Sequence, residues 1–384
     1  MLGVCIDYKN RNYGSKLQAL ATMRMLTAYC SDCEIIWYNK RTIGFFIRAI
    51  PRLLNFNFLS DRYDQVQRNI EYHRHPEIKK NICVRNKAME SFDKQFDERL
   101  STKYASYNEL VKQCKDRYDK VITCSDQLWS PAALGSKFYN LQFASEKMAK
   151  ISWASSFGVD SIPWYQKSRT KAYLQRIQHI SVRENRGAEI IKELTGREVP
   201  VLMDPVFVYS REEWNEMIPV REVEWKNYLF CYFLGSNKKH RKQAQDFAQK
   251  QGLTIVTVPH LDRYNQSDEG FGDFALYDIT PADFLNILRN AEYVCTDSFH
   301  GAAFSVIFRK PFLVFNRYNN RSKNSKNSRI DSFCDNLGLN DRRISEEEII
   351  EEKMMRQIAY EEVEEKILHY RNKTKEYLNK VFGE

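Results

Sequence analysis

Short apolar runs alternate with helical segments along most of this 384-residue chain. The alternation is steady from Leu2 to Met203, and a second series begins at Asn227. Because a helical segment between two strands favours a parallel crossover, the first series predicts one parallel sheet covered by helices. The strands expected in it are 2–7, 34–38, 118–124, 150–156, 179–184 and 199–203.

The length of the chain suggests two domains with an appendage. Ser345 and Glu348 fit a capping box at the start of a charged, helical C-terminal segment, which we expect to pack back across the first domain. The expected units are an N-terminal domain at 1–205 with a helical insertion at about 41–99, a linker at 206–226, a C-terminal domain at 227–340 and a C-terminal helical tail at 341–384.

Composition narrows the class of protein. Hydrophobic residues at 43% and aromatic residues at 13% are enough for two cores, which excludes a disordered chain. The net charge of +9 favours anionic partners, but the basic residues form no block typical of a nucleic-acid-binding tail, so no nucleic acid is expected. The basic, aromatic segment 41–58 is interpreted as packing against the protein, with peripheral contact with a membrane surface as the alternative.

Cysteine usage and hydropathy indicate the compartment. Of nine cysteines, only Cys30 and Cys33 form a Cys-x-x-Cys pair, so a zinc ribbon is not expected. The odd number favours a reducing compartment. The chain passes into its first strand without a signal-peptide pattern, and no window approaches ~20 apolar residues. We expect a cytoplasmic protein at most peripheral to the membrane, without a required metal because no acidic or histidine cluster has metal spacing.

A polar turn interrupts the apolar stretch 293–314. It contains Asp297, Ser298, His300 and Gly301, between an expected strand and a buried helix. In open α/β sheets, ligands bind at the carboxyl ends of strands, where helix N-termini point free N–H groups at anions. A functional His300 is one interpretation. The other is a packed histidine beneath a helix capped by Asp297 or Ser298.

A similar turn follows the first strand. Tyr13-Gly14-Ser15 precedes apolar residues at helical spacing, and Ser15 is the expected N-cap. Such a turn can bind phosphate through free N–H groups. With one glycine, it is neither a dinucleotide fingerprint nor a P-loop.

Seven segments in order resemble the polysaccharide pyruvyl transferase family and cover roughly residues 1–340. Each segment alone is a weak signal, and their common order makes the resemblance specific. They are Asn-Tyr-Gly-Ser at 12–15 with Leu-Gln-Ala at 17–19, Cys-Ser-Asp-Gln-Leu-Trp at 124–129, Ala-Ser-Ser-Phe-Gly at 154–158, Ser-Val-Arg-Glu at 181–184, Asp-Pro at 204–205, Thr-Asp-Ser-Phe-His-Gly at 296–301 and Ser-Arg at 328–329.

The resemblance implies two Rossmann-like domains that face a cleft, as in GT-B glycosyltransferases. It also implies transfer of the pyruvyl group of phosphoenolpyruvate to a sugar hydroxyl, with ketal formation, on a surface-polysaccharide precursor. The expected acceptor is a sugar or a lipid-linked oligosaccharide, and phosphoenolpyruvate is a substrate, so no separate cofactor is expected. His300 would serve as acid or base, and Asp297 would orient its imidazole or cap the helix.

The donor carries about three negative charges near neutrality and therefore needs guanidinium groups and helix N-termini. Arg183, at the polar end of a strand, is the first candidate, with a surface pair to Glu184 as the alternative. Arg329 is the second candidate. Ser298 and Gly301 complete the expected donor side.

The acceptor side is expected on two turns of the first domain. The carboxylate of Asp126 and the amide of Gln127 suit hydrogen bonds to sugar hydroxyls. Trp129 would offer its face to a sugar ring, with core packing as the alternative. The residues expected to line the same cleft from the first turn are Asn12, Gly14 and Ser15.

Two departures from the family pattern keep alternatives open. Some members have Arg-Leu-His where this chain has Ser298-Phe299-His300, and some have an aspartate where this chain has Ser15. Because this arginine is missing, a nucleotide-sugar glycosyltransferase of the same architecture is an alternative function. A non-catalytic glycan-assembly protein is a second alternative.

Overall fold

A computed structural model describes residues 1–38, 74–131, 137–262, 264–317 and 328–383, with isolated positions between 59 and 70. The amphipathic segment expected at 41–58 lies outside the described residues. The second half of the expected helical insertion is the long helix α4 (Pro76–Asp93), followed by a 3-10 turn.

The first domain is built on a five-stranded sheet in which every strand pair is parallel, as expected. The strand order is β2-β1-β3-β4-β5, so the order reverses between β1 and β3. Its strands are β1 (Leu2–Cys5), β2 (Cys33–Ile35), β3 (Lys120–Cys124), β4 (Ala149–Ser155) and β5 (His179–Val182), and its helices include α1 (Tyr13–Tyr29), α5 (Tyr107–Gln113), α6 (Trp164–Gln175) and α7 (Asn185–Thr195).

The expected strand at 199–203 is wrong. Val201 forms only an isolated bridge with Val182. Two hydrogen bonds form this bridge, from Val182 N to Pro200 O at 3.1 Å and from Leu202 N to Val182 O at 2.9 Å. Because Pro200 has no N–H, the ladder cannot continue on its N-terminal side.

The second domain is a six-stranded parallel sheet with the order β11-β10-β9-β6-β7-β8. Counted within the domain, this is the 3-2-1-4-5-6 order of a Rossmann fold, and it reverses between β6 and β9. Its strands are β6 (Tyr228–Tyr232), β7 (Thr254–Thr257), β8 (Phe274–Ala275), β9 (Tyr293–Thr296), β10 (Phe312–Phe315) and β11 (Arg343–Ile344), and its helices include α9 (Lys238–Gln251), α10 (Pro281–Asn290), α11 (Phe299–Ile307) and α12 (Ser328–Leu337).

The segment expected to link the domains contains a short helix, α8 (Arg211–Met217), with a Ser210–Glu213 capping box. Trp214 is fully buried, although its neighbours in the sequence are polar. Its indole N–H donates to the carbonyl of Val206 at 2.9 Å, and its ring meets Phe304 edge-on at 5.0 Å. The segment therefore packs into the core that both domains share.

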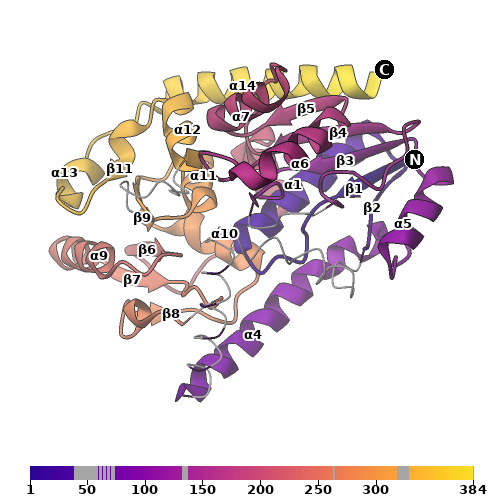
Figure 1. The fold of residues 1–384 in the computed structure, drawn as a ribbon. Helices are drawn as coiled ribbons and strands as arrows, with labels where there is room; N and C mark the ends of the chain where they lie inside the picture. The colour runs from indigo at the N-terminus through magenta and orange to yellow at the C-terminus, as the bar shows by residue number, and fades with distance from the viewer. Residues whose placement is uncertain are drawn as a thin grey trace.

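The C-terminal tail is two helices, α13 (Ile350–Met354) and α14 (Tyr360–Gly383), rather than one helix from Ser345. The N-cap of α13 is Ile349, so the expected capping box at Ser345 does not start it. As expected, the tail returns to the first domain: Tyr377 donates to the carbonyl of Ser152 at 2.8 Å. Figure 1 shows α14 running along the first domain, past α7 and towards the N-terminus.

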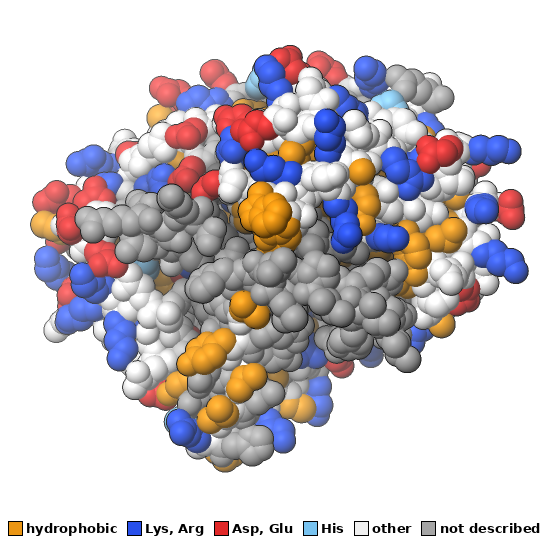
Figure 2. Space-filling model, viewed as in Figure 1, with side chains coloured by type: hydrophobic (Ala, Val, Ile, Leu, Met, Phe, Trp, Pro, Cys, Tyr) orange, Lys and Arg blue, Asp and Glu red, His pale blue; other side chains and the backbone are white. Residues whose placement is uncertain are grey.

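Among the described residues, no helix is long and apolar enough to cross a membrane. On the face seen in Figure 2, the described lysines and arginines are interspersed with acidic side chains rather than gathered into one block. This distribution agrees with the spread of charge along the sequence.

Candidate active site

The point of strand-order reversal in each sheet brings polar turns together between the two domains. Ligands of open parallel sheets bind at such points. In the first domain the turns follow β1 and β3, and in the second they follow β6 and β9. The first turns of α1 and α11 meet there, because a methyl group added to Gly14 would lie 2.2 Å from Cβ of His300.

Two helix N-termini therefore face one another across the domain boundary. Asn12, not Ser15 as expected, caps α1, with its Oδ1 accepting from Ser15 N at 3.2 Å. Ser298 caps α11, with its Oγ accepting from Gly301 N at 3.4 Å. The positive ends of both helices favour an anion at this place.

His300 is buried at this junction, with 4% of its surface exposed. Its Nε2 lies 3.7 Å from Oδ2 of Asp204 and, within the described part of the chain, has no hydrogen-bond partner. An imidazole nitrogen that is buried and unpaired is available to a substrate atom.

We expect Gly14→Ala to lower activity by about 100-fold, because the new Cβ would lie 2.2–2.5 Å from three atoms of His300 and force one helix to move. The control is Gly187→Ala in the first turn of α7, where the nearest atom is 3.4 Å away. Turnover of the two variants, measured beside their thermal unfolding, checks this. Equal activity in both would contradict the close packing of Gly14 on His300.

Asp204 lies at the centre of the buried network, with 1% of its surface exposed. Oδ2 accepts from Ser125 Oγ at 2.8 Å and from Nη1 of Arg183, and Oδ1 accepts from Val206 N at 3.1 Å. Burial alone would raise the pKa of Asp204, but Arg183 and His300 outweigh it and hold the pKa well below its ordinary value. The carboxylate is therefore ionised at neutral pH.

A depressed pKa makes the stability contributed by Asp204 depend on pH. The contribution is present above the unfolded pKa of about 3.9 and is lost as pH falls towards the folded value. We expect Asp204→Asn to lower the free energy of unfolding by about 3 kcal/mol at pH 7, because Arg183 loses its buried partner. The difference should narrow below about pH 4.

Denaturant unfolding at pH 7, 5 and 3.5 checks this expectation. Asp246→Asn is the control, because Asp246 is half exposed and, within the described residues, pairs with Lys242 one helical turn away. A difference for Asp204→Asn that stays constant down to pH 3.5 would contradict the assigned pairing.

Arg183 is buried with 5% of its surface exposed, so the alternative of a surface pair with Glu184 is wrong. Its Nη1 pairs with Asp204, and its Nε lies 3.7 Å from Oε1 of Glu184. Its guanidinium carbon lies 4.6 Å from the centre of the Phe299 ring. Among the described residues, Nε and Nη2 have no hydrogen-bond partner. Two donors of a buried guanidinium that lack hydrogen-bond partners are available to bind an anion.

Asp126 joins the same network from the first domain. Ser15 donates to its Oδ2 at 2.7 Å. Burial opposes its ionisation, but Arg183, His300 and the Ser15 hydrogen bond lower the pKa of Asp126 below its ordinary value. Ser125 and Asp126 both have positive φ, of 43° and 51°, which is strained for residues other than glycine. Such strain concentrates at functional sites.

Gln127 and Arg329 connect the site to α12. With its amide oxygen towards Arg329, Gln127 accepts from Nε at 3.2 Å and from Nη2 at 3.1 Å. Gly158, at φ +62°, leaves space for Gln127, because a Cβ there would lie 2.2 Å from the side-chain amide of Gln127. Burial, with the neighbouring charges of Arg183 and Arg317, lowers the pKa of Arg329 to about 10. Three guanidinium groups thus lie close enough to influence one another.

Asp297 has a different role from the two expected. Its carboxylate accepts from Leu234 N at 2.7 Å and Gly235 N at 2.8 Å, so it holds the loop after β6. It neither caps α11 nor reaches His300, whose nearby carboxylate is Asp204. Gly301 is needed for packing, because a Cβ there would lie 2.5 Å from Thr296 Oγ1.

Trp129 lies in the core, which was its alternative interpretation. It is 5% exposed, its indole N–H donates to the Tyr139 carbonyl at 3.0 Å, and its ring packs on Phe157. It therefore has no free face for a sugar. The interdomain junction contains Asn12, Gly14, Ser15, Asp126 and Gln127, and Ser15 donates a hydrogen bond to Asp126 there. Their role in binding an acceptor stays a prediction.

Residues of the site that were not expected are Ser125, Asp204 and Arg317. Arg317 follows β10, donates to the Asp297 carbonyl at 2.8 Å and lies 3.5 Å from its carboxylate. All three follow apolar runs, and polar residues in that position were the signal that identified Arg183 and Asp126. The same signal applied to every run would have selected them.

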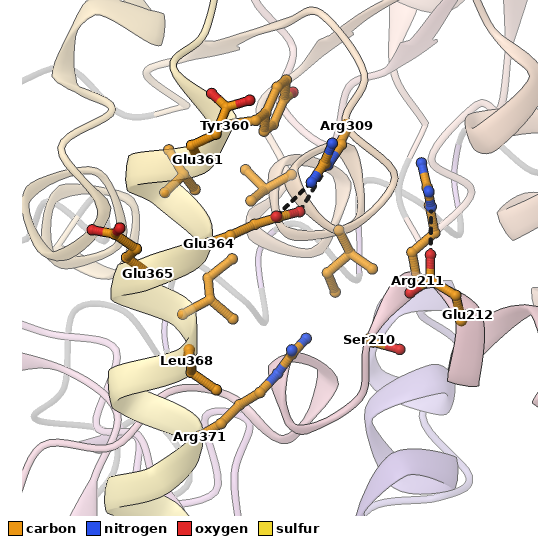
Figure 3. Close-up of a pocket in the computed structure, with 14 residues that line it drawn as sticks. Ser210, Arg211, Glu212, Arg309, Tyr360, Glu361, Glu364, Glu365, Leu368 and Arg371 are labelled. Carbon is orange, nitrogen blue, oxygen red and sulfur yellow. Dashed lines mark hydrogen bonds and ion pairs between the residues drawn. The ribbon is translucent and has the colours of Figure 1, made fainter.

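A cavity of about 530 Å³ lies away from these residues, between α8, α11 and α14 (Figure 3). Arg309 forms a bidentate pair with Glu364, and Arg211 pairs with Glu212. Arg371 donates to backbone carbonyls. Because the three arginines that line it are paired or hydrogen-bonded within the protein, we do not assign the chemistry to this cavity. In the described part of the chain, no group of three or more His, Cys, Asp or Glu could hold a metal ion.

The two Rossmann-like sheets, with a buried polar junction between them, define a GT-B-type enzyme fold. The sequence model of a family described as polysaccharide pyruvyl transferase matches residues 12–320. The match covers more than half of the chain, so the chain belongs to the polysaccharide pyruvyl transferase family. This membership supports a role in polysaccharide modification. No curated protein sequence matches the chain.

The chain resembles solved structures at low sequence identity. UDP-GlcNAc 2-epimerase from Methanocaldococcus jannaschii is 10% identical with a TM-score of 0.50, and the match covers 96% of this chain and 91% of that one. A putative UDP-N-acetylglucosamine 2-epimerase from Listeria monocytogenes is 10% identical, with a TM-score of 0.49 and coverages of 99% and 89%. Escherichia coli heptosyltransferase WaaC with ADP is more distant, at 12% identity, a TM-score of 0.38 and coverages of 84% and 88%. At these identities the first likeness shows the fold alone.

Proposed function

We propose that this protein transfers the pyruvyl group of phosphoenolpyruvate to a sugar hydroxyl of a polysaccharide precursor and closes a ketal. The observation that carries the proposal is a set of buried atoms, Nε and Nη2 of Arg183 and Nε2 of His300, that have no hydrogen-bond partner among the described residues. The donor offers a carboxylate and a phosphate to these groups and to the two helix N-termini. Membership of the polysaccharide pyruvyl transferase family supports this class of reaction.

The donor is bound by the guanidinium of Arg183 and by two helix N-termini. Nε and Nη2 of Arg183 bind its carboxylate or phosphate, since a guanidinium binds two oxygens of such a group. The N-termini of α1 and α11 stabilise the remaining negative charge. Arg329 lies beside Gln127 and donates hydrogen bonds to its amide oxygen. The arginine that some members carry at position 298 is thus replaced in function by cations from other turns.

The reaction begins with a proton delivered to the methylene carbon of the donor, with His300 as the acid. The adjacent carbon becomes an oxocarbenium-like centre, and a sugar hydroxyl forms a C–O bond to it as that hydroxyl loses its proton. A second hydroxyl then displaces phosphate from the same carbon, which closes the ketal and releases phosphate with a proton. Asp204 stabilises the charged imidazole from 3.7 Å, and Asp126 accepts a hydrogen bond from the sugar.

Titration calorimetry with phosphoenolpyruvate tests the donor assignment. We expect saturable binding to the wild type, competition by inorganic phosphate and loss of binding in Arg183→Ala. A nucleotide sugar serves as the comparison ligand. Binding of the nucleotide sugar without binding of phosphoenolpyruvate would replace the proposal with glycosyl transfer.

A further inference from the structure

A second pocket lies between helix α4 and the loops that follow β7 and β8. We call it the α4 pocket. One wall is formed by Glu77, Ile78 and Asn81 of α4, and the opposite wall by residues of the second domain between 259 and 277. Figure 1 shows α4 extending from the first domain towards β8. The pocket therefore spans both domains. Its volume of about 280 Å³ suits a ligand of about one sugar unit, since pockets for larger, drug-sized ligands start at ~300 Å³.

Hydrogen bonds join the α4 pocket to the candidate active site. Asp268, in its wall, accepts from Nε of Arg241 at 2.8 Å, and Nη2 of Arg241 donates to the Gly235 carbonyl at 2.8 Å. The N–H of Gly235 donates to Asp297 at 2.8 Å, in the turn that carries His300. The pocket also lies at the same edge of the second sheet, because β7 is two strands from β9 and their carboxyl ends are about 10 Å apart.

The charge of the α4 pocket differs from that of the candidate active site. Its described lining residues include four carboxylates and no lysine or arginine. Each carboxylate already has a partner within the protein: a guanidinium for Asp268, a backbone N–H for Asp273, a phenol for Glu269 and an imidazole for Glu77. The surplus negative charge disfavours a phosphate or a carboxylate, so the pocket is not a second site for an anion.

Two uncharged polar groups remain available to a ligand. They are the amide of Asn81 and the hydroxyl of Tyr277, on opposite walls, and neither has a hydrogen-bond partner in the described part of the chain. The rings of Tyr264 and Phe271 also line the pocket, and His75 stacks on Tyr264 with ring centres 4.9 Å apart. Neutral hydrogen-bonding groups beside aromatic rings suit a ligand with hydroxyl groups and an apolar face, which is the chemistry of a neutral sugar.

We propose that the α4 pocket binds an uncharged sugar unit of the acceptor, next to the unit that receives the pyruvyl group at the interdomain junction. The inference rests on the proposed function and specifies its acceptor: a glycan of at least two sugar units, of which one is neutral and is bound by Asn81 and Tyr277. Because this sugar does not react, its contacts determine which acceptor is chosen and leave the chemical step to the junction.

The test is the double variant Asn81→Ala/Tyr277→Phe in the full chain, which removes both polar groups and keeps the aromatic ring. Acceptor kinetics are measured with a panel of neutral aryl glycosides of one and two sugar units. For the wild type we expect kcat/KM to be about tenfold higher with the two-sugar acceptors, because only these gain hydrogen bonds in the pocket. The variant should lose this preference, with the one-sugar acceptors and the KM of phosphoenolpyruvate unchanged. An equal preference in both proteins would overturn the proposal.

The matched control is Lys80→Ala/Tyr370→Phe. Lys80 is an exposed residue of α4, Tyr370 lies on α14, and neither lines the α4 pocket. The control should keep the preference of the wild type for the two-sugar acceptors. Loss of the preference in the control as well would contradict the assignment to Asn81 and Tyr277.

Saturation-transfer NMR with the same glycosides separates this proposal from the proposed function, because it requires no turnover. We expect a signal from the two-sugar glycosides with the wild type and a much weaker one with the double variant, while calorimetry shows equal binding of phosphoenolpyruvate. Glycoside binding that depends on both residues, without any binding of phosphoenolpyruvate, would support the pocket and contradict pyruvyl transfer.

Three outcomes would overturn the pocket assignment while leaving pyruvyl transfer intact. The first is no signal from any neutral glycoside, and the second is an equal signal with wild type and double variant. The third is binding of spermidine or uridine that the double variant abolishes, with no binding of neutral glycosides, which would assign the pocket to a cation or to a nucleoside.

Discussion

Replacing His300 by alanine is expected to lower kcat by about 10²–10⁴-fold, the range for loss of a general acid or base. The buried Nε2 has no hydrogen-bond partner among the described residues and lies 3.7 Å from Asp204. Because no described hydrogen bond depends on this nitrogen, its removal should affect turnover more than folding. His300→Gln, which restores bulk next to Gly14, should remain inactive.

His369→Ala is the matched control, because His369 is an exposed histidine on α14 outside the site. Single-turnover measurements with saturating donor separate chemistry from binding. Retained kcat in His300→Ala, with only KM raised, would show that this histidine positions the donor and leaves proton transfer to another group.

Replacing Arg183 by lysine is expected to raise the donor KM by about 100-fold or more while the protein remains folded. Lysine keeps a positive charge for Asp204, but it lacks the planar pair of donors, Nε and Nη2, that the structure leaves unpaired among the described residues. Arg183→Ala should additionally destabilise the protein by about 3–5 kcal/mol, since Asp204 would be buried without its cation.

Arg186→Lys is the control for Arg183→Lys. Arg186 lies three residues further along, on α7, and its partly exposed side chain pairs with Glu189 and Glu193. Donor titration and denaturant unfolding of both variants separate weaker donor binding from lower stability. An unchanged donor KM in Arg183→Lys would contradict the anion-binding role, whatever happens to stability.

The local pattern of the sequence was sufficient for the central strands of both sheets and for the turns that carry the site, but it predicted a strand at 199–203 that is absent and missed the short edge strands β8 and β11. The alternation of apolar runs and helical segments predicts the parallel strands, and polar residues after those runs identify Arg183, Asp126 and His300. Gly196 predicts the end of α7, where it adopts φ +76°. These features depend on residues close together in the chain, so a sequence pattern can carry them.

The pairing of the site residues could not be predicted in the same way. Asp204, rather than Asp297, is the carboxylate near His300, because packing of the second domain on the first brings residues almost 100 positions apart into contact. Trp129 is core because Phe157 and Tyr139 cover it. The carboxylate of Asp297 accepts hydrogen bonds from the loop after β6, about 60 residues earlier in the chain. No pattern in the sequence around Asp297 indicates this contact.

Acceptor-dependent release of phosphate from phosphoenolpyruvate is the most direct test of the central proposal. Purified protein is supplied with donor and a panel of acidic, phosphorylated and neutral glycosides, and the acceptor is weighed by mass spectrometry. We predict phosphate release together with a mass gain of one pyruvyl ketal, both absent in His300→Ala and Arg183→Ala. Phosphate release without a change in acceptor mass, or no release with any acceptor alongside transfer from a nucleotide sugar, would contradict it.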